Sequence, residues 1–387
     1  MSIFPVKIAF MRILLVGEYS NLHNSLKAGL QALGHEVILL STGDAFKKLP
    51  SDIDVRGKRI QDNRFLNLIR HGIFKVTKQD LALIETAFKT KRILKKQKPF
   101  DVIQLINEYP LKTPYRHERK IIKLLRKLGD RMIVLASGDD HIYLSNIEQL
   151  PHHPMRQHAG KVTFGYSQKY LTEKHKKFHD LVFRLKDLVI ASDLDYHTIY
   201  NGRKEYYGMI PNPVNLDKIH VPPFPSTEKI KVFHGINRSN YHKKGNDIFE
   251  RALHIILKKY GDRVQVLTTE SLPYADYINL YNDSHIIMDQ CYALDQGYNA
   301  LEAMAKGKVV FTGAGDAFCK RYGLCQNEVA IHTIPDVDKI VDDLSQLVEN
   351  PEKMIEISKK ARQFVSENHD YKEVAKQYVA AYESVMV

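Results

Sequence analysis

The chain has 387 residues, of which 44% are hydrophobic, so it is long enough for two domains of ordinary size with packed cores. Its 3 cysteines form neither a paired framework nor a metal-ligand spacing, which excludes the disulfide-stapled class and favours a reducing, cytoplasmic location. No run approaches the roughly 18 apolar residues of a spanning helix, and Lys7 and Arg12 interrupt the apolar start. We therefore expect neither an exported nor a membrane-spanning protein, and Met11 is a second candidate for the natural start.

Residues 11–44 predict a strand, a helix and a second strand. An apolar run ends at Gly17, leucines follow at helical spacing, and a second apolar run comes after the turn at Gly34. This order is that of the β-α-β unit of a parallel sheet. Gly17 stands alone, without a G-x-G-x-x-G pattern, so a Rossmann-type dehydrogenase is disfavoured.

The segment of residues 56–127 is strongly basic. It holds 20 Lys and Arg against 6 Asp and Glu, a net charge of +14 where the whole chain carries +12. Much of this charge falls on two predicted helices, at residues 79–96 and 118–128. Two interpretations stay open, namely a merely solvated face and a contact with an anionic membrane surface or acceptor. Nucleic acid is a disfavoured partner, because no recognisable module or interleaving of aromatic and basic residues is present.

Two further apolar runs, at residues 100–107 and 131–137, predict core strands of the same sheet. Polar residues follow each of them, and Asp139 and Asp140 follow the second. The carboxyl ends of parallel strands meet at one edge of a sheet, where open α/β sheets bind ligands. Asp139 and Asp140 are therefore candidate site residues, with a capping and turn role as the alternative. The histidines of residues 152–177 have no spacing that indicates a metal site.

A proline-rich segment at residues 221–227 is the strongest linker signal in the chain. We therefore predict a first domain at residues 1–220, a second at 221–370, and a C-terminal helix at 371–387. The first strand of the second domain leads into a loop with Arg238, and Lys244 follows six residues later with Gly245 beside it. Two such cations suit a diphosphate, because arginine offers a fork of donors and lysine a point charge.

A second polar cluster follows the buried strand predicted at residues 284–288. Asp289 and Gln290 stand at its carboxyl end, Gly297 enters the next helix, and Glu302 is the only carboxylate of that helix. Further on, the loop with Gly315 offers backbone N–H groups to a sugar or phosphate. An ordinary solvated helix residue is the alternative for Glu302.

The stretch GYNALEAMAKG at residues 297–307 resembles the signature of retaining, family-4-type glycosyltransferases of group 1, which have the GT-B fold. The usual signature has another glutamate eight positions before Glu302, where this chain has Leu294. With Asp289 and Gln290 at the strand end, the chain is more similar to a branch that acts in bacterial polysaccharide and glycoconjugate synthesis.

The resemblance implies an α/β, GT-B fold, in which two Rossmann-like parallel-sheet domains face a central cleft and the last helix returns to the first domain. It also implies a UDP- or GDP-sugar as donor substrate with no cofactor, and retaining transfer to a glycan or lipid-linked acceptor. The implied catalytic residues are Arg238, Lys244, Asp139 and Asp140. The implied donor-binding residues are Gly17, Asp289, Gln290, Gly297, Glu302 for the ribose, Tyr274 for stacking on the base, and Gly315. Core packing is the alternative for Tyr274.

We expect no metal ion in this reaction. Asp193 and Asp195 fit the D-x-D pattern of a metal motif, but they follow a strand of the first domain, so we expect them to lie away from the diphosphate residues. We expect Arg238, Lys244 and helix N-termini to stabilise the negative charge of the leaving group instead. The alternatives to a transferase are a nucleotide-sugar epimerase on the same fold and a catalytically silent binding or scaffold subunit. The expected location is the cytoplasm, peripherally on the inner face of the cytoplasmic membrane.

Overall fold

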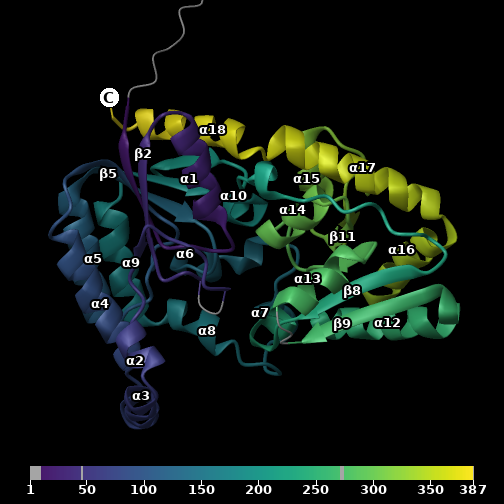
Figure 1. The fold of residues 1–387 in the computed structure, drawn as a ribbon, viewed down its shortest axis with the longest axis horizontal. Coiled ribbons are helices and arrows are strands. Elements are labelled where there is room, and N and C mark those ends of the chain that lie inside the picture. The colour runs from purple at the N-terminus through teal and green to yellow at the C-terminus, as the bar shows by residue number, and fades with distance from the viewer. Residues whose placement is uncertain (1–9, 45–46, 271–273, 387) are drawn as a thin grey trace, which may run out of the picture.

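The structure is a computed structural model that describes residues 10–44, 47–270 and 274–386, without the side chains of residues 274–277. Two parallel β-sheets, one of 7 strands and one of 5, lie side by side with helices packed around each (Figure 1). The predicted α/β architecture with two Rossmann-like parallel-sheet domains is confirmed. Among the described residues, no helix combines the length and the apolar character that crossing a membrane requires.

The first sheet has the strand order β3-β2-β1-β4-β5-β6-β7. Its strands are β1 (Arg12–Val16), β2 (Glu36–Ser41), β3 (Ile53–Asp54), β4 (Phe100–Leu105), β5 (Gly129–Ala136), β6 (Leu188–Ala191) and β7 (Tyr206–Met209). Its longer helices are α1 (Leu22–Ala32), α4 (Leu81–Leu94), α5 (Tyr115–Leu128), α9 (Glu173–Leu185) and α10 (Leu194–Tyr200). Ile13 and Leu15 enter the core beside α1, whereas Leu14 and Val16 enter the core beside α4 and α5. Both faces are buried, which explains why the strands read as continuous apolar runs.

The second sheet has the order β12-β11-β10-β8-β9. Its strands are β8 (Ile230–Ile236), β9 (Val264–Glu270), β10 (Ile286–Met288), β11 (Val309–Thr312) and β12 (Ile331–His332). Its helices are α11 (Tyr241–Lys244), α12 (Asn246–Tyr260), α13 (Tyr274–Asn282), α14 (Tyr298–Ala305), α15 (Asp316–Tyr322), α16 (Val337–Glu349) and α17 (Pro351–Asn368). All its paired strands are parallel, so their carboxyl ends share one edge. That edge faces the first domain.

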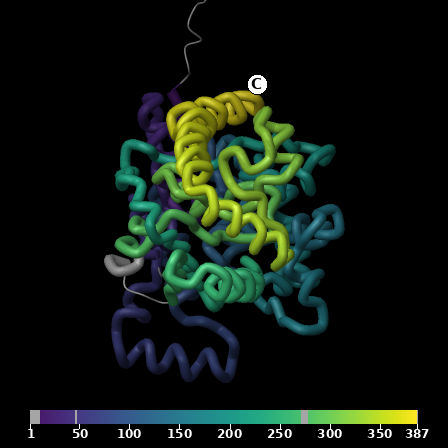
Figure 2. Tube along the Cα trace, turned by 90° about the vertical axis from the view of Figure 1, so that its right-hand side faces the viewer, coloured from purple at the N-terminus to yellow at the C-terminus, as the bar shows by residue number. Residues whose placement is uncertain are grey.

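The chain crosses between the two domains twice, and the two crossings lie together. The first runs between β7 and β8 and contains the predicted boundary at residues 220 and 221. The second joins α17 to α18 (Tyr371–Glu383), which runs back over the first domain (Figure 2). Val214 N donates to His369 O at 2.7 Å, and Tyr371 N donates to Val214 O at 3.2 Å. α18 packs against α1 so closely that a Cβ on Gly29 would collide with the carbonyl oxygen of Tyr371.

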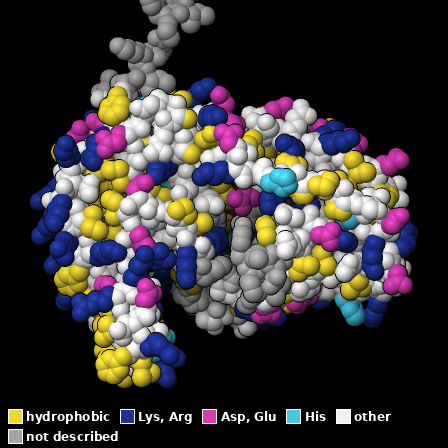
Figure 3. Space-filling view, viewed as in Figure 1, with side chains coloured by type: hydrophobic (Ala, Val, Ile, Leu, Met, Phe, Trp, Pro, Cys, Tyr) yellow, Lys and Arg dark blue, Asp and Glu magenta, His cyan; other side chains and the backbone are white. Residues whose placement is uncertain are grey.

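A helical hairpin of α2 (Lys58–Asp62) and α3 (Arg64–Thr77) projects from the first domain. It forms the downward projection in Figures 1 and 2, and the tip of that projection is largely apolar in Figure 3. The helices predicted for residues 79–96 and 118–128 are present as α4 and α5, but no helix was predicted for residues 58–77. No residue of α2 or α3 is buried, so this hairpin contributes nothing to the core.

Candidate functional site

A cavity of about 210 Å³ lies between the two domains, where loops after the strands of both sheets meet. The first domain lines it with Asp139, Tyr143, His153, Pro154, Asp193, Asp195 and Tyr196. The second domain lines it with Asn240, Lys243, Lys244, Gln290, Tyr292, Ala293, Asp295 and Gly297. The cavity therefore brings together four of the residues predicted from sequence, namely Asp139, Lys244, Gln290 and Gly297.

Lys244 is the best-positioned cation of this cavity. It ends α11, because Gly245 takes a left-handed conformation (φ 79°) and lies against Cys291, whose Sγ leaves no room for a Cβ. The Lys244 Nζ lies 2.7 Å from Asp289 Oδ1, and Asp289 Oδ2 accepts a hydrogen bond from Thr312 Oγ1 at 3.2 Å. Asp289 stands directly after β10, as predicted, and holds the ammonium at the cavity. Gln290, the next residue, lines the cavity itself.

Arg238 does not line the cavity in this arrangement. It lies in the 3₁₀ turn after β8, and its guanidinium forms a fork with both oxygens of Glu270, each at 2.7 Å. The Arg238 side chain is 58% exposed. Solvent screens an ion pair this exposed, so turning Arg238 from Glu270 toward an anionic ligand costs little.

The two neighbouring aspartates after β5 have different environments. Asp139 is buried at the cavity, where its Oδ1 lies 2.6 Å from Lys243 Nζ of the other domain and its Oδ2 accepts from Ser167 Oγ at 2.6 Å. Burial opposes ionisation of Asp139, but the Lys243 ammonium, together with the Ser167 hydroxyl and His153, outweighs burial and lowers the pKa of this carboxyl. Asp140 caps α6 (His141–Ser145) by accepting from Tyr143 N at 2.6 Å, and it does not line the cavity. The capping alternative thus describes Asp140.

Glu302 lies half-buried in α14, behind the N-terminus of that helix at Gly297. Burial raises the pKa of Glu302, and Lys306 together with Lys47 of the first domain partly offsets this shift. Within the described residues, the Glu302 carboxylate accepts no hydrogen bond, so it is available to a polar ligand. The nearness of Lys47 shows that α14 faces the first domain, to which Tyr298 also bonds through a 2.8 Å contact of its OH with Ser25 Oγ.

Two other predicted donor-binding residues, Gly17 and Gly315, are not brought to the cavity. Gly17 has a φ of 88°, and a Cβ there would collide with Ile106, so this glycine serves packing within the first domain. A Cβ on Gly315 would lie 2.8 Å from the His332 ring, which explains the need for glycine at the start of α15. Tyr274 begins α13, but its side chain lies outside the described residues.

The expectation that Asp193 and Asp195 lie away from the diphosphate residues is wrong, because both line the cavity with Lys244. They form an acidic group with Asp295 of the second domain. Asp195 Oδ2 accepts from Leu294 N and Asp295 Oδ2 accepts from Leu194 N, each at 3.0 Å. Burial is the largest cause that raises the pKa of Asp193 to about 6, of Asp195 to about 8 and of Asp295 well above its usual value. Sequence separation hid this group, since its members come from different domains.

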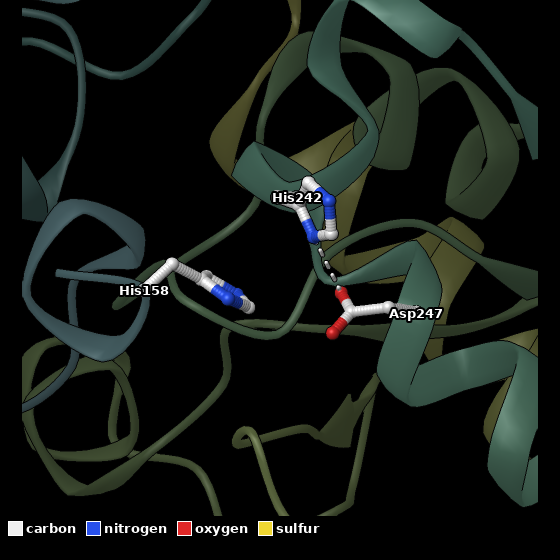
Figure 4. A group of neighbouring side chains, drawn as sticks. All are labelled: His158, His242 and Asp247. Atoms are coloured by element: carbon white, nitrogen blue, oxygen red, sulfur yellow. Dashed lines mark ion pairs between the residues drawn. The ribbon is translucent and has the colours of Figure 1, made fainter. Parts of the chain in front are cut away.

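Another group spans the same interface. His158 follows α7 (Pro154–Gln157), while His242 and Asp247 flank Gly245, and Figure 4 shows the three side chains converging. The His242 Nδ1 lies 3.5 Å from Asp247 Oδ1, and the His158 Nε2 lies 3.1 Å from the hydroxyl of Tyr292. Two imidazoles and a carboxylate are a ligand set that suits Zn²⁺ or a similar divalent ion. The histidine spacing in residues 152–177 did not indicate this group, because two of its ligands belong to the second domain.

Sequence reasoning also missed Lys243, Tyr292 and Asp295 as cavity residues. Lys243 offered one signal, since it precedes Lys244 in a loop already assigned to phosphate binding. Asp295 is two positions before Gly297 in the recognised signature. Tyr292 offered none, because its position depends on the packing of the two domains.

Comparisons with known proteins indicate a family for part of the chain and a fold for the whole of it. The family described as "Glycosyl transferase-like" matches residues 239–380, which include Lys244, Asp289 and Glu302. A comparison with curated proteins found no match. Among solved structures, sucrose-phosphate synthase from Thermosynechococcus elongatus has a TM-score of 0.61 at 15% identity, over 97% of this chain and 99% of that one.

Two further structures share the fold at low identity. HepE of Anabaena, solved with UDP and glucose, has a TM-score of 0.58 at 13% identity, over 97% of this chain and 100% of that one. A putative UDP-N-acetylglucosamine 2-epimerase from Listeria monocytogenes has a TM-score of 0.51 at 11% identity, over 97% and 96% of the two chains. The fold of the whole chain is therefore GT-B. Residues 239–380 match the glycosyl transferase family, and the whole chain shares its fold with sucrose-phosphate synthase and HepE.

Proposed function

We propose that this enzyme binds a nucleotide-diphosphate sugar in the interdomain cavity and transfers the sugar to a glycan or lipid-linked acceptor. Transfer proceeds with retention and without a metal ion, in the synthesis of a surface polysaccharide or glycoconjugate. The observation that carries the proposal is the placement of Lys244 at the cavity, where Asp289 holds it near Gly297 at the start of α14. HepE, which shares the fold, was solved with UDP and glucose, and this supports a UDP-sugar as the donor.

In this proposal the diphosphate takes the place of the carboxylates that now face the two cations. Lys244 exchanges Asp289 for a phosphate oxygen, and Arg238 turns from Glu270 to the second phosphate. The backbone N–H groups at the start of α14 add a partial positive charge on the same side. These groups stabilise the negative charge that grows on the diphosphate as the bond to the sugar breaks. Glu302 accepts hydrogen bonds from the ribose hydroxyls.

The side chains that bind the transferred sugar differ here from those of the usual family signature. Leu294 stands where that signature has a glutamate, and its backbone N–H is bonded to Asp195. Gln290 and Asp295 of the second domain line the cavity beside it, and Asp139 lines it from the first. We propose that these side chains bind the sugar hydroxyls.

The two domains must separate for the donor to enter. The cavity of about 210 Å³ is smaller than the roughly 300–1,000 Å³ of a typical small-molecule site. The reciprocal bonds of Asp195 and Asp295 and the Lys243–Asp139 ion pair close the cavity on both sides. The paired crossings at Val214 and Tyr371 form the pivot of this motion.

The test is incubation of the purified enzyme with UDP-glucose, UDP-N-acetylglucosamine and GDP-mannose, with release of the nucleoside diphosphate as the readout. Release that depends on an added acceptor, with the donor's anomeric configuration kept in the product and with EDTA without effect, supports the proposal. Donor converted to an epimer without an acceptor would instead identify an epimerase. Binding without any turnover would identify a silent subunit.

A further inference from the structure

Helix α3 carries its largest apolar side chains on the outside of the molecule. Phe65, Leu68 and Val76 are 69%, 71% and 84% exposed, and Ile69 and Phe74 are partly covered at 38% and 46%. The structure buries no residue of α3. An apolar surface of this density is uncommon on a soluble protein and marks a contact with another molecule or with lipid.

Most of these side chains lie on one face. Phe65, Leu68, Ile69, Gly72 and Val76 occupy positions i, i+3, i+4, i+7 and i+11, so they form a single stripe along the helix. A helix of a globular protein uses such a stripe to pack on its own core. Here the stripe points away from the described part of the molecule, at the end of the projection in Figure 3.

The hairpin is anchored firmly at its base even though its tip is free. Arg70 forms a fork with both oxygens of Asp80, each at 2.6 Å, which ties α3 to the start of α4. Glu85 of α4 accepts from Ile60 N of α2 at 3.0 Å, and Asn63 caps α3 by accepting from Leu66 N at 3.0 Å. These bonds hold the projection, and with it the apolar stripe, in a defined position relative to α4.

The charge around the stripe is basic. α3 contains Arg64, Arg70 and Lys75 and no acidic residue. Beyond it, a hollow of about 360 Å³ on α5 is lined by Tyr115 and five cations, namely Arg116, Arg119, Lys120, Lys123 and Lys174. Figure 3 shows Lys and Arg side chains along the edge of the molecule that α4 and α5 form.

We propose that α3 is an interfacial membrane anchor, which inserts its apolar stripe among the acyl chains of an anionic bilayer while α3, α4 and α5 contact the headgroups. An amphipathic helix with lysine and arginine beside its apolar face is the pattern of helices that lie in the membrane interface. A second copy of the chain fits less well, because a symmetric contact through α3 brings identical basic helices together. Within the membrane contact expected from residues 56–127, α3 is thus the element that inserts into the bilayer. The basic side chains of α4 and α5 attract the anionic headgroups without inserting.

The first experiment is cosedimentation with vesicles of phosphatidylcholine containing phosphatidylglycerol. The triple variant Phe65→Ser, Leu68→Ser, Val76→Ser should weaken binding by on the order of tenfold for each side chain. The matched control is Ile255→Ser, Leu257→Ser on α12, whose two side chains are each 40% exposed on the other domain. The control should bind as the wild type does, and both variants should keep the wild-type circular dichroism and melting temperature.

A second experiment measures insertion directly and uses the absence of tryptophan from the chain. Val76→Trp should give fluorescence that shifts to shorter wavelength with anionic vesicles and is quenched by brominated acyl chains. Ile255→Trp should show neither change. The insertion persists at about 0.5 M salt, where purely electrostatic attachment is screened within a few ångströms.

Four results would overturn the proposal. The wild type does not bind vesicles; the triple variant binds as well as the wild type; or Val76→Trp is not quenched by the brominated chains. A wild-type dimer that the triple variant dissociates would assign the stripe to a second copy, which also overturns it. All of these measurements are independent of donor turnover, so failure of the proposed transferase reaction leaves them interpretable.

Discussion

Replacing Lys244 with alanine should affect catalysis and stability separately, and a second substitution should tell the two effects apart. Lys244→Ala removes the cation that we assign to the donor diphosphate. Loss of such a contact costs about 2–4 kcal/mol in the transition state, which is on the order of 30- to 1,000-fold in kcat/KM. The same change leaves Asp289, whose side chain is 5% exposed, without its cation.

The stability effect follows from that orphaned carboxylate. Among the described residues, only the 3.2 Å hydrogen bond from Thr312 Oγ1 would remain to Asp289, so Lys244→Ala should lower the free energy of unfolding by about 1–3 kcal/mol. Adding Asp289→Asn replaces the buried charge with a neutral amide. The double variant should therefore regain most of the lost melting temperature but none of the lost turnover.

The assay pairs a thermal melt with the release of nucleoside diphosphate under kcat/KM conditions. Recovery of turnover in the double variant would show that Lys244 acts only by holding Asp289 in place. Near-wild-type turnover in Lys244→Ala would remove Lys244 from the diphosphate site altogether. Either result refutes the assignment, whereas a melt restored without turnover supports it.

Three further predictions follow from the same cavity. Arg238→Ala should lose about 2–4 kcal/mol of transition-state stabilisation. Its melting temperature should hardly change, because the pair of Arg238 with Glu270 is exposed. Turnover equal to that of the wild type would contradict this prediction. Glu302→Gln should weaken binding of the free nucleoside diphosphate in calorimetric titration while the fold is kept, and unchanged affinity would contradict the ribose contact. Burial raises the pKa of Asp195 to about 8, so the protonated form of Asp195 favours the closed domains. The stability that this carboxyl adds to the closed form is complete below about pH 4 and is lost as the pH rises through about 8. Small-angle scattering should find the molecule more open at pH 8.5 than at pH 5.5, and Asp195→Asn with Asp295→Asn should reduce the difference.

Local patterns were sufficient to predict most core strands of both sheets, whereas the strands β3, β7 and β12 were not predicted. Strands such as β1 and β10 are buried on both faces, so they read as unbroken apolar runs between helical segments. Asp289 directly follows β10, and Lys244 lies eight positions after the end of β8, so both come from the carboxyl edge of the second sheet. Asp140 marks the limit of that reasoning, because a residue at a strand end can cap a helix instead of facing the ligand.

Contacts between the domains could not be read from the sequence. Asp195 bonds to Leu294 across 99 positions, and the spacing within residues 193–195 holds no information about its partner. Arg238 was predicted to lie in the loop after the first strand of the second domain, but its direction toward Glu270 depends on a side chain that a strand 32 positions later supplies.

The sequence by itself determined that this protein is built from two parallel-sheet domains, and it indicated which strand-end loops carry polar residues. It could do so because apolar periodicity and strand-end polarity are properties of short stretches. Only the tertiary structure decided that Asp193, Asp195 and Asp295 meet between the domains and that the stripe on α3 stays uncovered. Both features depend on how whole domains and helices pack in three dimensions. An apolar helical face, for example, has the same sequence pattern whether a core covers it or not.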